Sequence, residues 1–351
     1  MAQKRKKVLI ALSGGLDSAM AALLLQERGF DCTAVFMVTS NLAQAAQTEA
    51  ERIADRLGIK LDVLDLRSDF EQILDYFCSE YGRGRTPNPC VVCNRRIKFG
   101  RLWDFARGNG AGSLATGHYA RIIKNNDQPG LYEAAYPAKD QSYALAMIDR
   151  SVLGHIIFPM GSFSKGQTRQ MAAKFGLVAK QKEESQEICF IPDNDYAAVL
   201  ERLEPELVRA GDIADSSGKI LGRHDGVHKF TIGQRRGLRV AMGRPYYVVK
   251  IDAKTNTVTL GPKEELMHRG FTATQVNWLI DRREGPFRAN VKIRYNDNGS
   301  SAMVLPQANS VLVQFDEAVS AITPGQLAVF YIQQGGNNRV AGGGWIEAAA
   351  D

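Results

Sequence analysis

The 351-residue chain lacks any apolar run of the length that crosses a membrane. A transmembrane helix needs about 20 consecutive apolar residues, and no stretch of this sequence approaches that length. The basic residues 1–7 are followed by an apolar stretch that is too short for a signal peptide. These absences predict a cytoplasmic protein with no membrane partner.

Cysteine is scarce, with five residues in the whole chain. An odd number in a cytosolic protein argues against a structural disulfide framework and leaves either chemistry or buried packing. Cys90 and Cys93 form one C-x-x-C pair, but a second C-x-x-C pair is missing, which disfavours a structural zinc site. Cys32 and Cys78 fall on apolar positions of an expected strand and an expected helix, and we interpret both as core residues.

Neither a strong charge imbalance nor an internal repeat is present. The net charge is +6 and the pI about 9.0, which permits a nucleic-acid partner without requiring one. With 44% hydrophobic residues, the chain can form a sizeable core. At about 100–200 residues per domain, its length predicts two or three domains.

The most informative stretch lies near the start, where the apolar run 8–12 is followed by Ser-Gly-Gly-Leu-Asp-Ser at 13–18 and then by a helical pattern. The glycine pair allows a sharp turn and close approach of a ligand to the backbone. Unpaired N–H groups and the helix dipole favour an anion at that helix start. No Gly-Lys-Ser/Thr follows, so this is not a Walker A loop. The string predicts a phosphate site, and a plain strand–turn–helix connection is the alternative.

Strands expected at 8–12, 32–38 and 59–66 alternate with helices expected at 17–28, 43–57 and 69–80. This alternation predicts a parallel α/β sheet, with ligands at the carboxyl ends of its strands. The glycine- and proline-containing residues 81–100 are expected to form a basic loop, and 122–138 a turn-rich insertion. From about residue 211 the chain becomes strand-rich. A hairpin about Thr255 and Asn256 is expected there, and short strands at 291–295, 303–305, 311–315, 328–332 and 340–346 predict a small barrel.

Cys90 and Cys93 stand among cationic residues of the expected basic loop: Arg83, Arg85, Arg95, Arg96 and Lys98. Nearby cations lower the pKa of a thiol and raise its thiolate fraction. Cys189 lies far away in sequence, in a loop beside the last elements of the α/β region. It is therefore expected to reach the same end of the sheet.

Nine short strings occur in a distinctive order, at 13–18, 86–89, 93–94, 97–99, 117–121, 139–143, 188–191, 231–235 and 342–346. In this order and spacing the chain resembles the bacterial-type tRNA-specific 2-thiouridylases, which are ATP pyrophosphatases with a PP-loop. The resemblance covers essentially the whole length. It implies a PP-loop domain of the adenine nucleotide alpha hydrolase type over 1–205, a small central domain over 206–262 and a C-terminal β-barrel over 263–351.

The resemblance also implies a reaction. ATP would adenylate the C2 oxygen of the wobble uridine, and sulfur would replace that oxygen as AMP leaves. Cys189 would carry the sulfur as a persulfide received from an upstream donor protein. Cys93 would be the other catalytic thiol, releasing sulfide or forming a transient disulfide with Cys189. Mg²⁺ would accompany the phosphates, with Asp17 as a candidate contact.

Two sets of binding residues follow from the matched strings. The ATP set is Ala11, Leu12, Ser13, Gly14, Gly15, Leu16, Asp17, Ser18, Met37 and Gly117. The tRNA set, for the anticodon arm and its flipped base, is Asn88, Pro89, Cys90, His118, Lys139, Asp140, Gln141, Arg294, Tyr295 and Gln326. Without the resemblance, His118 would be interpreted as a structural hydrogen-bonder, Tyr295 as barrel core, and the arginines of 235–239 as a solvated loop.

Cys90 departs from the family pattern, which has Asp at this position. One interpretation is an added thiol that can pair with Cys93. The alternative is that Cys90, Cys93 and Cys189 bind a [4Fe–4S] cluster that would replace the persulfide route. Two other functions also remain: an amidotransferase-type synthetase that adenylates a small molecule, and a non-catalytic RNA-binding protein with a relic loop.

Overall fold

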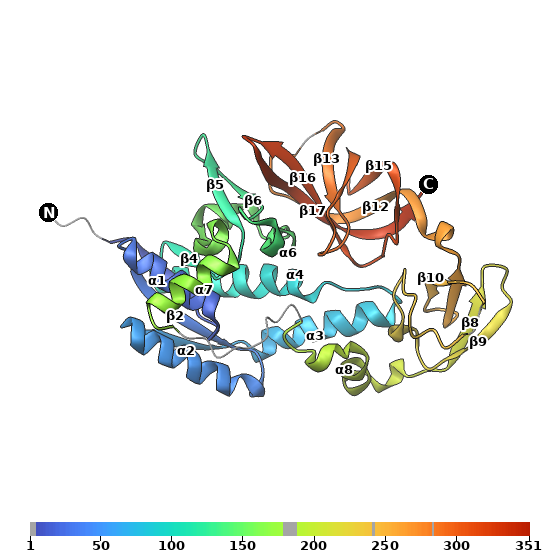
Figure 1. The fold of residues 1–351 in the computed structure, drawn as a ribbon, viewed down its shortest axis with the longest axis horizontal. Coiled ribbons are helices and arrows are strands. Elements are labelled where there is room, and N and C mark those ends of the chain that lie inside the picture. The colour runs from blue at the N-terminus through green and yellow to red at the C-terminus, as the bar shows by residue number, and fades with distance from the viewer. Residues whose placement is uncertain (1–4, 178–187, 241–242, 283) are drawn as a thin grey trace.

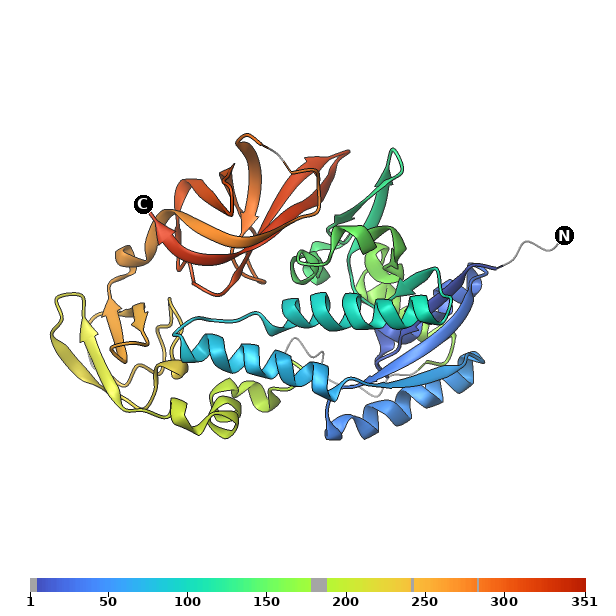
Figure 2. The ribbon, with the colours of Figure 1, turned by 180° about the vertical axis from the view of Figure 1, so that it is seen from behind.

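The computed structural model describes residues 5–177, 188–240, 243–282 and 284–351. Figure 1 shows an elongated molecule, with the N-terminal α/β part at one end, a small β part at the other, and a barrel above the helices that link them. The view from behind in Figure 2 shows the same arrangement. None of the described helices is long and apolar enough to cross a membrane.

A five-stranded parallel sheet forms the N-terminal part, in the order β3-β2-β1-β4-β7. Its strands are β1 (Lys7–Ala11), β2 (Asp31–Val38), β3 (Leu61–Asp65), β4 (Ser113–Ala115) and β7 (Ile156–Ile157). The predicted α/β class is confirmed. The strand order reverses between β1 and β4, and the crevice at such a point is where ligands bind in open α/β sheets.

Helices cover both faces of this sheet, so β1 is buried on both sides. Val8 and Ile10 pack into one apolar cluster with α1 (Leu16–Glu27) and α2 (Gln44–Leu57). Leu9 and Ala11 pack into a second cluster with α3 (Arg67–Gly82) and α5 (Leu102–Gly108). Burial of each large aliphatic side chain contributes about 2 kcal/mol. Because helices bury both faces of β1, its sequence is continuously apolar and does not alternate between apolar and polar residues.

The expectation that residues 81–100 form a loop is wrong for their second half. A helix α4 (Pro89–Cys93) continues through a π-helix, η2 (Asn94–Arg101), into α5. Pro89 stands at the first helical position, where its missing N–H costs nothing and its fixed φ suits the helix. The same proline that indicated a loop therefore begins a helix, and Cys90 and Cys93 lie one turn apart on it.

The expected turn-rich insertion at 122–138 is largely a hairpin of β5 (Arg121–Asn125) and β6 (Gln128–Tyr132). Asn126 and Asp127 both have positive φ, as a tight two-residue hairpin turn requires. The hairpin pairs with the last strand of the barrel at Tyr132 and Arg339. This contact links the N-terminal part to the barrel.

The second β part is a four-stranded sheet in the order β10-β11-β8-β9. Its strands are β8 (Gly211–Asp215), β9 (Ile220–His224), β10 (Tyr247–Asp252) and β11 (Thr257–Gly261). The predicted hairpin is confirmed, and Asn256 takes the left-handed conformation of its turn. A small apolar cluster around Val248, Val258 and Leu260 holds this sheet together.

The barrel runs in the order β12-β15-β14-β13-β16-β17, and pairing of β12 with β17 closes it, as the sequence predicted. Its strands are β12 (Met267–Trp278), β13 (Phe287–Lys292), β14 (Ser300–Pro306), β15 (Ser310–Ser320), β16 (Leu327–Gln334) and β17 (Asn337–Ala350). The sequence analysis missed β12. The remaining α-helices are α6 (Ser142–Leu145), α7 (Lys165–Lys174) and α8 (Tyr196–Leu203).

Short 3₁₀ turns connect many of these elements: η1 (Asn41–Ala43), η3 (Pro137–Lys139), η4 (Arg150–His155), η5 (Pro159–Ser162), η6 (Pro192–Asn194), η7 (Pro205–Leu207), η8 (Val227–Lys229) and η9 (Lys263–Leu266). Helix α7 begins directly after Ser164. Ser164 and Gln167 form its capping box, in which each side chain bonds the other residue's backbone N–H.

Candidate active site

Hydrogen bonds of Ser18 fix the conformation of the loop between β1 and α1. The Ser18 hydroxyl donates to the carbonyl of Gly15 at 2.9 Å and accepts the backbone N–H of Ser13 at 3.2 Å. Gly14 has φ +76°, and a Cβ there would lie 2.5 Å from the carbonyl oxygen of Ala46 on α2. Only glycine therefore fits this turn, and the backbone stays exposed at the carboxyl end of β1.

Asp17 in the first turn of α1 is the centre of a polar cluster. Lys165 Nζ donates to both carboxylate oxygens of Asp17, at 2.7 and 2.6 Å. The Tyr119 hydroxyl donates to the same carboxylate at 2.8 Å and lies 3.1 Å from the Thr168 hydroxyl. Tyr119 follows β4, so strands on both sides of the switch point contribute to the cluster.

Lys165 is a functional candidate that the sequence analysis missed. It is the first residue of α7, and the capping box of Ser164 and Gln167 fixes that helix end. Arg169, one turn later, lines the same cleft. The signal in the sequence was a lysine directly after a capping serine. The neighbouring residues do not show that this helix faces the phosphate loop, which lies some 150 residues earlier in the chain.

One cleft of about 1800 Å³ joins the phosphate loop to distant parts of the chain. Its walls include residues 13–17 and α7 on one side, and Lys139, Tyr295 and Cys189 on the other. Single small-molecule pockets are about 300–1,000 Å³. The cleft is therefore large enough for a nucleotide triphosphate and a second, bulky substrate.

The other residues of the predicted ATP set lie around this loop rather than in the cleft wall. Ala11 and Leu12 belong to the buried end of β1, and Ser18 is almost fully buried. Met37 lies on β2 and packs against the core. Gly117 approaches the backbone of Asp17 and Ser18 so closely that a Cβ would come within 2.8 Å of it.

The thiols of Cys90, Cys93 and Cys189 influence one another electrostatically, which places them in one neighbourhood. Removal from water raises the pKa of each thiol, to about 11 for Cys93, although Lys98 lowers all of them. The expectation that the surrounding cations produce a low thiol pKa is therefore wrong. Arg85, for example, pairs with Glu80 and Glu347 instead.

Alkylation of Cys93 by iodoacetamide should therefore depend strongly on pH. Because only the thiolate reacts, a pKa of about 11 predicts a rate that rises about tenfold per unit from about pH 7 to pH 10. Peptide mass spectrometry after timed alkylation measures this rate residue by residue. A small free thiol of ordinary pKa is the control, and a plateau for Cys93 near neutral pH would contradict the raised pKa.

His118 and Gln141, two residues of the predicted tRNA set, already have partners within the protein. His118 Nδ1 lies 2.7 Å from the Thr116 hydroxyl, and burial with the nearby Lys98 holds the pKa of His118 well below its usual range. His118 is therefore neutral at pH 7. Gln141 Oε1 accepts the backbone N–H of Tyr119 at 2.9 Å.

Asp140 and Tyr295 lie together at the cleft. The Asp140 carboxylate accepts the N–H of Ala134 at 2.8 Å and the hydroxyl of Ser142 at 2.7 Å, while burial raises the pKa of Asp140. The Tyr295 hydroxyl donates to the Asp140 carbonyl at 3.3 Å. Tyr295 is 45% exposed, so it is not barrel core. Its neighbour Arg294 is also exposed.

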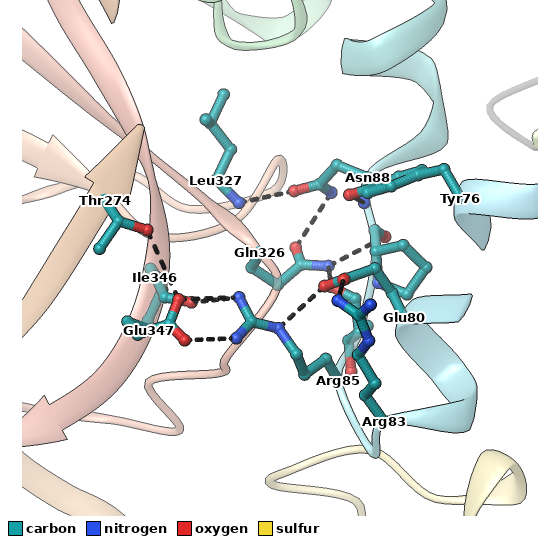
Figure 3. Close-up of polar contacts among 12 residues, drawn as sticks. Tyr76, Glu80, Arg83, Arg85, Asn88, Thr274, Gln326, Leu327, Ile346 and Glu347 are labelled. Carbon is teal, nitrogen blue, oxygen red and sulfur yellow. Dashed lines mark hydrogen bonds and ion pairs between the residues drawn. The ribbon is translucent and has the colours of Figure 1, made fainter. Parts of the chain in front are cut away.

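Asn88 and Gln326 lie outside the cleft wall and bond each other. Asn88 Nδ2 donates to Gln326 Oε1 at 3.2 Å, and Asn88 Oδ1 accepts the N–H of Leu327 at 2.7 Å. Pro89 follows Asn88 and is buried at the start of α4. Asn88 and Gln326 thus form part of the contact between the segment that precedes α4 and the barrel (Figure 3).

Within the described ranges, no group of three or more His, Cys, Asp or Glu side chains is gathered so that it could hold a metal ion. Cys90, Cys93 and Cys189 are neighbours, but they do not form such a ligand group.

Family models match three consecutive parts of the chain. They are described as "tRNA methyl transferase HUP domain" for residues 6–193, "tRNA methyl transferase PRC-barrel domain" for 199–262 and "Aminomethyltransferase beta-barrel domain" for 268–346. The tRNA-specific 2-thiouridylase MnmA of Syntrophotalea carbinolica is 43% identical, over 99% of this chain and 100% of its own. The chain belongs to the tRNA-specific 2-thiouridylase family. The resemblance inferred from the ordered strings is confirmed.

Other relatives agree with this membership. The 2-thiouridylase MnmA of Geotalea uraniireducens is 41% identical, over 99% of this chain and 96% of its own. A solved U34-tRNA thiolase NcsA from Methanococcus maripaludis, with its [4Fe-4S] cluster, is 18% identical. It covers 59% of this chain and 68% of its own with a TM-score of 0.37, an overlap too small to carry an argument. The family relation spans the full length, including the 2-thiouridylase barrel.

Proposed function

We propose that this chain catalyses the ATP-dependent 2-thiolation of the wobble uridine of tRNA. The observation that carries the proposal is the single cleft that holds the phosphate loop, Cys189 and the exposed Tyr295. Adenylation modifies the C2 oxygen of the uridine and sulfur then attacks the C2 carbon bonded to it, so the residues for both steps have to share one space. The PP-loop domain would span 1–205, the central domain 206–262 and the barrel 263–351, with the cytoplasm as the compartment.

The phosphate loop is the ATP end of the cleft. We assign the triphosphate to the exposed backbone of residues 13–17, with the substrate Mg²⁺ near Asp17. Lys165, at 2.6 Å from Asp17, is close enough to neutralise phosphate oxygens when MgATP enters. The uridine C2 oxygen then attacks the α-phosphorus, and pyrophosphate leaves. The oxygen now carries AMP, which is a good leaving group, so the C2–O bond can break in the next step.

The thiols supply the second half of the reaction. The terminal sulfur of a persulfide on Cys189 attacks C2, and AMP departs. A thiolate at Cys93 then attacks Cys189 Sγ, which breaks the S–S bond, leaves sulfur on the uridine and forms a Cys93–Cys189 disulfide. A cellular thiol reductant returns both cysteines to the reduced state. Because the pKa of Cys93 is raised to about 11 even with Lys98 nearby, the step needs bound substrate to favour the thiolate.

The tRNA would reach the cleft through its anticodon arm. An exposed tyrosine is suited to stack on an unstacked base, and Tyr295 takes that position at the cleft rim. Its exposed neighbour Arg294 would contact the backbone. Lys139, Asp140 and Gln141 contribute to the adjacent wall, so we assign them to the same substrate. Asn88, Pro89, Cys90, His118 and Gln326 complete the tRNA side.

The test of this proposal is the acceptor dependence of ATP cleavage. We expect AMP and pyrophosphate to form when a wobble-uridine tRNA is the acceptor. Their rate of formation should be at background level with free uridine, and also with a small acid plus ammonia. Cleavage with the small acid and without tRNA would instead support an amidotransferase-type synthetase. The absence of ATP turnover with any acceptor would support a non-catalytic RNA-binding protein.

The iron–sulfur alternative has its own test. Protein purified without oxygen is expected to be colourless, iron-free and fully active with a persulfide donor. Activity that requires iron and follows a visible iron–sulfur absorbance would replace the persulfide route. The donor protein that supplies sulfur is identified only as a persulfide carrier.

A further inference from the structure

The segment that leads into the thiol-bearing helix has no regular structure of its own. Residues 85–88 join the turn after α3 to Pro89, and backbone groups without secondary structure need partners elsewhere. These partners come from α3 and from the barrel. On the α3 side, the Arg85 N–H donates to the Glu80 carbonyl at 2.9 Å and the Asn88 N–H to the Tyr76 hydroxyl at 3.4 Å. The Thr86 N–H donates to the Pro324 carbonyl at 2.9 Å, and Gln326 Nε2 donates to the Thr86 carbonyl at 3.1 Å.

Asn88 extends the same contact to the last residue before α4. Its side chain bonds both Gln326 and the backbone of Leu327, the first residue of β16. Gly325 makes the approach possible, because it has φ +88° and a Cβ there would lie 2.9 Å from the Thr86 carbonyl oxygen. The barrel loop 323–327 therefore acts together with α3 to position the start of α4.

Arg85 joins two elements, α3 and β17, at this contact. Its Nε donates to Glu80 of α3 at 2.8 Å, while Nη1 donates to Glu347 of β17 at 2.8 Å. Nη2 adds a bond to the Ile346 carbonyl at 3.3 Å (Figure 3). The two glutamates raise the pKa of Arg85 against the opposing effect of burial, so the guanidinium stays charged.

The helix beyond this contact is not a uniform rod. The π-helix η2 begins at Asn94, directly after Cys93, and its wider turns interrupt the α-helical pattern. The turn that carries Cys90 and Cys93 is thus separated from α5 by an irregular segment. Its position depends on the packing of Val91 and Val92 in the core and on the contacts at its N-terminal end.

We propose that Arg85 and Glu347 are positioning residues, through which the barrel holds Cys90 and Cys93 in register with the ATP end of the cleft. The proposal rests on the proposed thiolation. Both residues act through the segment 85–88 and contact neither ATP nor the thiols. Loss of this contact should impair sulfur transfer and leave ATP binding intact.

Arg83 provides a matched control two residues away. It also pairs with Glu80, at 3.5 Å, but its side chain is 69% exposed and forms no ion pair with the barrel among the described residues, whereas that of Arg85 is 20% exposed. Arg85→Ala and Glu347→Gln should lower the kcat for thiolation at least tenfold and keep the KM for ATP within about twofold, since misplacement of about 1 Å costs up to about 100-fold. Arg83→Ala should match the parent protein.

Two further readouts separate positioning from a general loss of structure. Hydrogen exchange should quicken in residues 84–93 of Arg85→Ala and stay unchanged in residues 7–18. The double variant Arg85→Ala with Glu347→Gln should lose no more than Arg85→Ala alone, because both changes break one contact. Equal kcat in Arg85→Ala and Arg83→Ala, or unchanged exchange at 84–93, would overturn the proposal. If the parent protein forms no 2-thiouridine, the proposed function fails, and the exchange result still decides the positioning.

Discussion

Cys189→Ser is expected to abolish 2-thiouridine formation, with a loss of at least about 1000-fold. Serine has nearly the shape of cysteine but cannot carry a persulfide. Because the hydrogen bonds that hold the phosphate loop, Asp17 and Lys165 do not involve Cys189, these residues should remain unchanged. The measurement is nucleoside mass spectrometry for thiolation, together with calorimetric titration of ATP, which should give the affinity of the parent protein.

Cys32→Ser is the matched control for this variant. Cys32 is half-buried on β2 and packs against the apolar cluster of α1 and α2, away from the cleft wall. Its replacement should leave thiolation within about twofold of the parent rate. Full activity of Cys189→Ser would refute the sulfur-carrying role, and simultaneous loss of ATP binding would show that the change damages the fold.

Lys165→Ala should reduce tRNA-dependent AMP formation by about 100-fold or more, a typical cost of removing a positioned cation or donor from a developing negative charge. Lys165 Nζ sits between both Asp17 oxygens at the end of the cleft where we place the phosphates. After its loss, the Tyr119 hydroxyl still donates to the Asp17 carboxylate. Pyrophosphate release under saturating tRNA measures the effect.

Lys174 offers the comparison on the same helix. It lies in the last turn of α7, is exposed, and is not part of the cleft wall. Lys174→Ala should retain the parent rate of AMP formation. If Lys165→Ala keeps more than about half of the parent rate, Lys165 has no role in ATP cleavage and the phosphates lie elsewhere.

Sequence patterns predicted those parts of the fold whose geometry depends on residues that are neighbours in the chain. The glycine turn at residues 14–15 follows an apolar strand and precedes a helix, so its geometry depends on neighbours in sequence. The alternating elements likewise predicted the parallel sheet. Pro89 shows the limit, because proline is equally suited to a loop and to the first turn of a helix. The helix forms here because α4 packs against α3 and the core.

Long-range contacts explain what the sequence did not reveal at the site. Lys165 meets Asp17 across 148 residues, and Arg85 meets Glu347 across 262. The sequence placed Arg85 among the cations that activate Cys90 and Cys93, whereas its charge is taken up by two carboxylates. Burial then has the largest effect on the pKa of the Cys93 thiol. It raises that pKa, whereas the basic residues nearby in sequence predicted a lowered one.

Mass spectrometry of tRNA nucleosides is the most direct test of the proposed reaction. A wobble-uridine tRNA transcript is incubated with the protein, MgATP and a persulfide source, then digested and analysed. The proposal predicts 2-thiouridine at the wobble position, formed only with ATP and accompanied by an equal amount of AMP. ATP cleavage without any 2-thiouridine, with the persulfide source present, would contradict it.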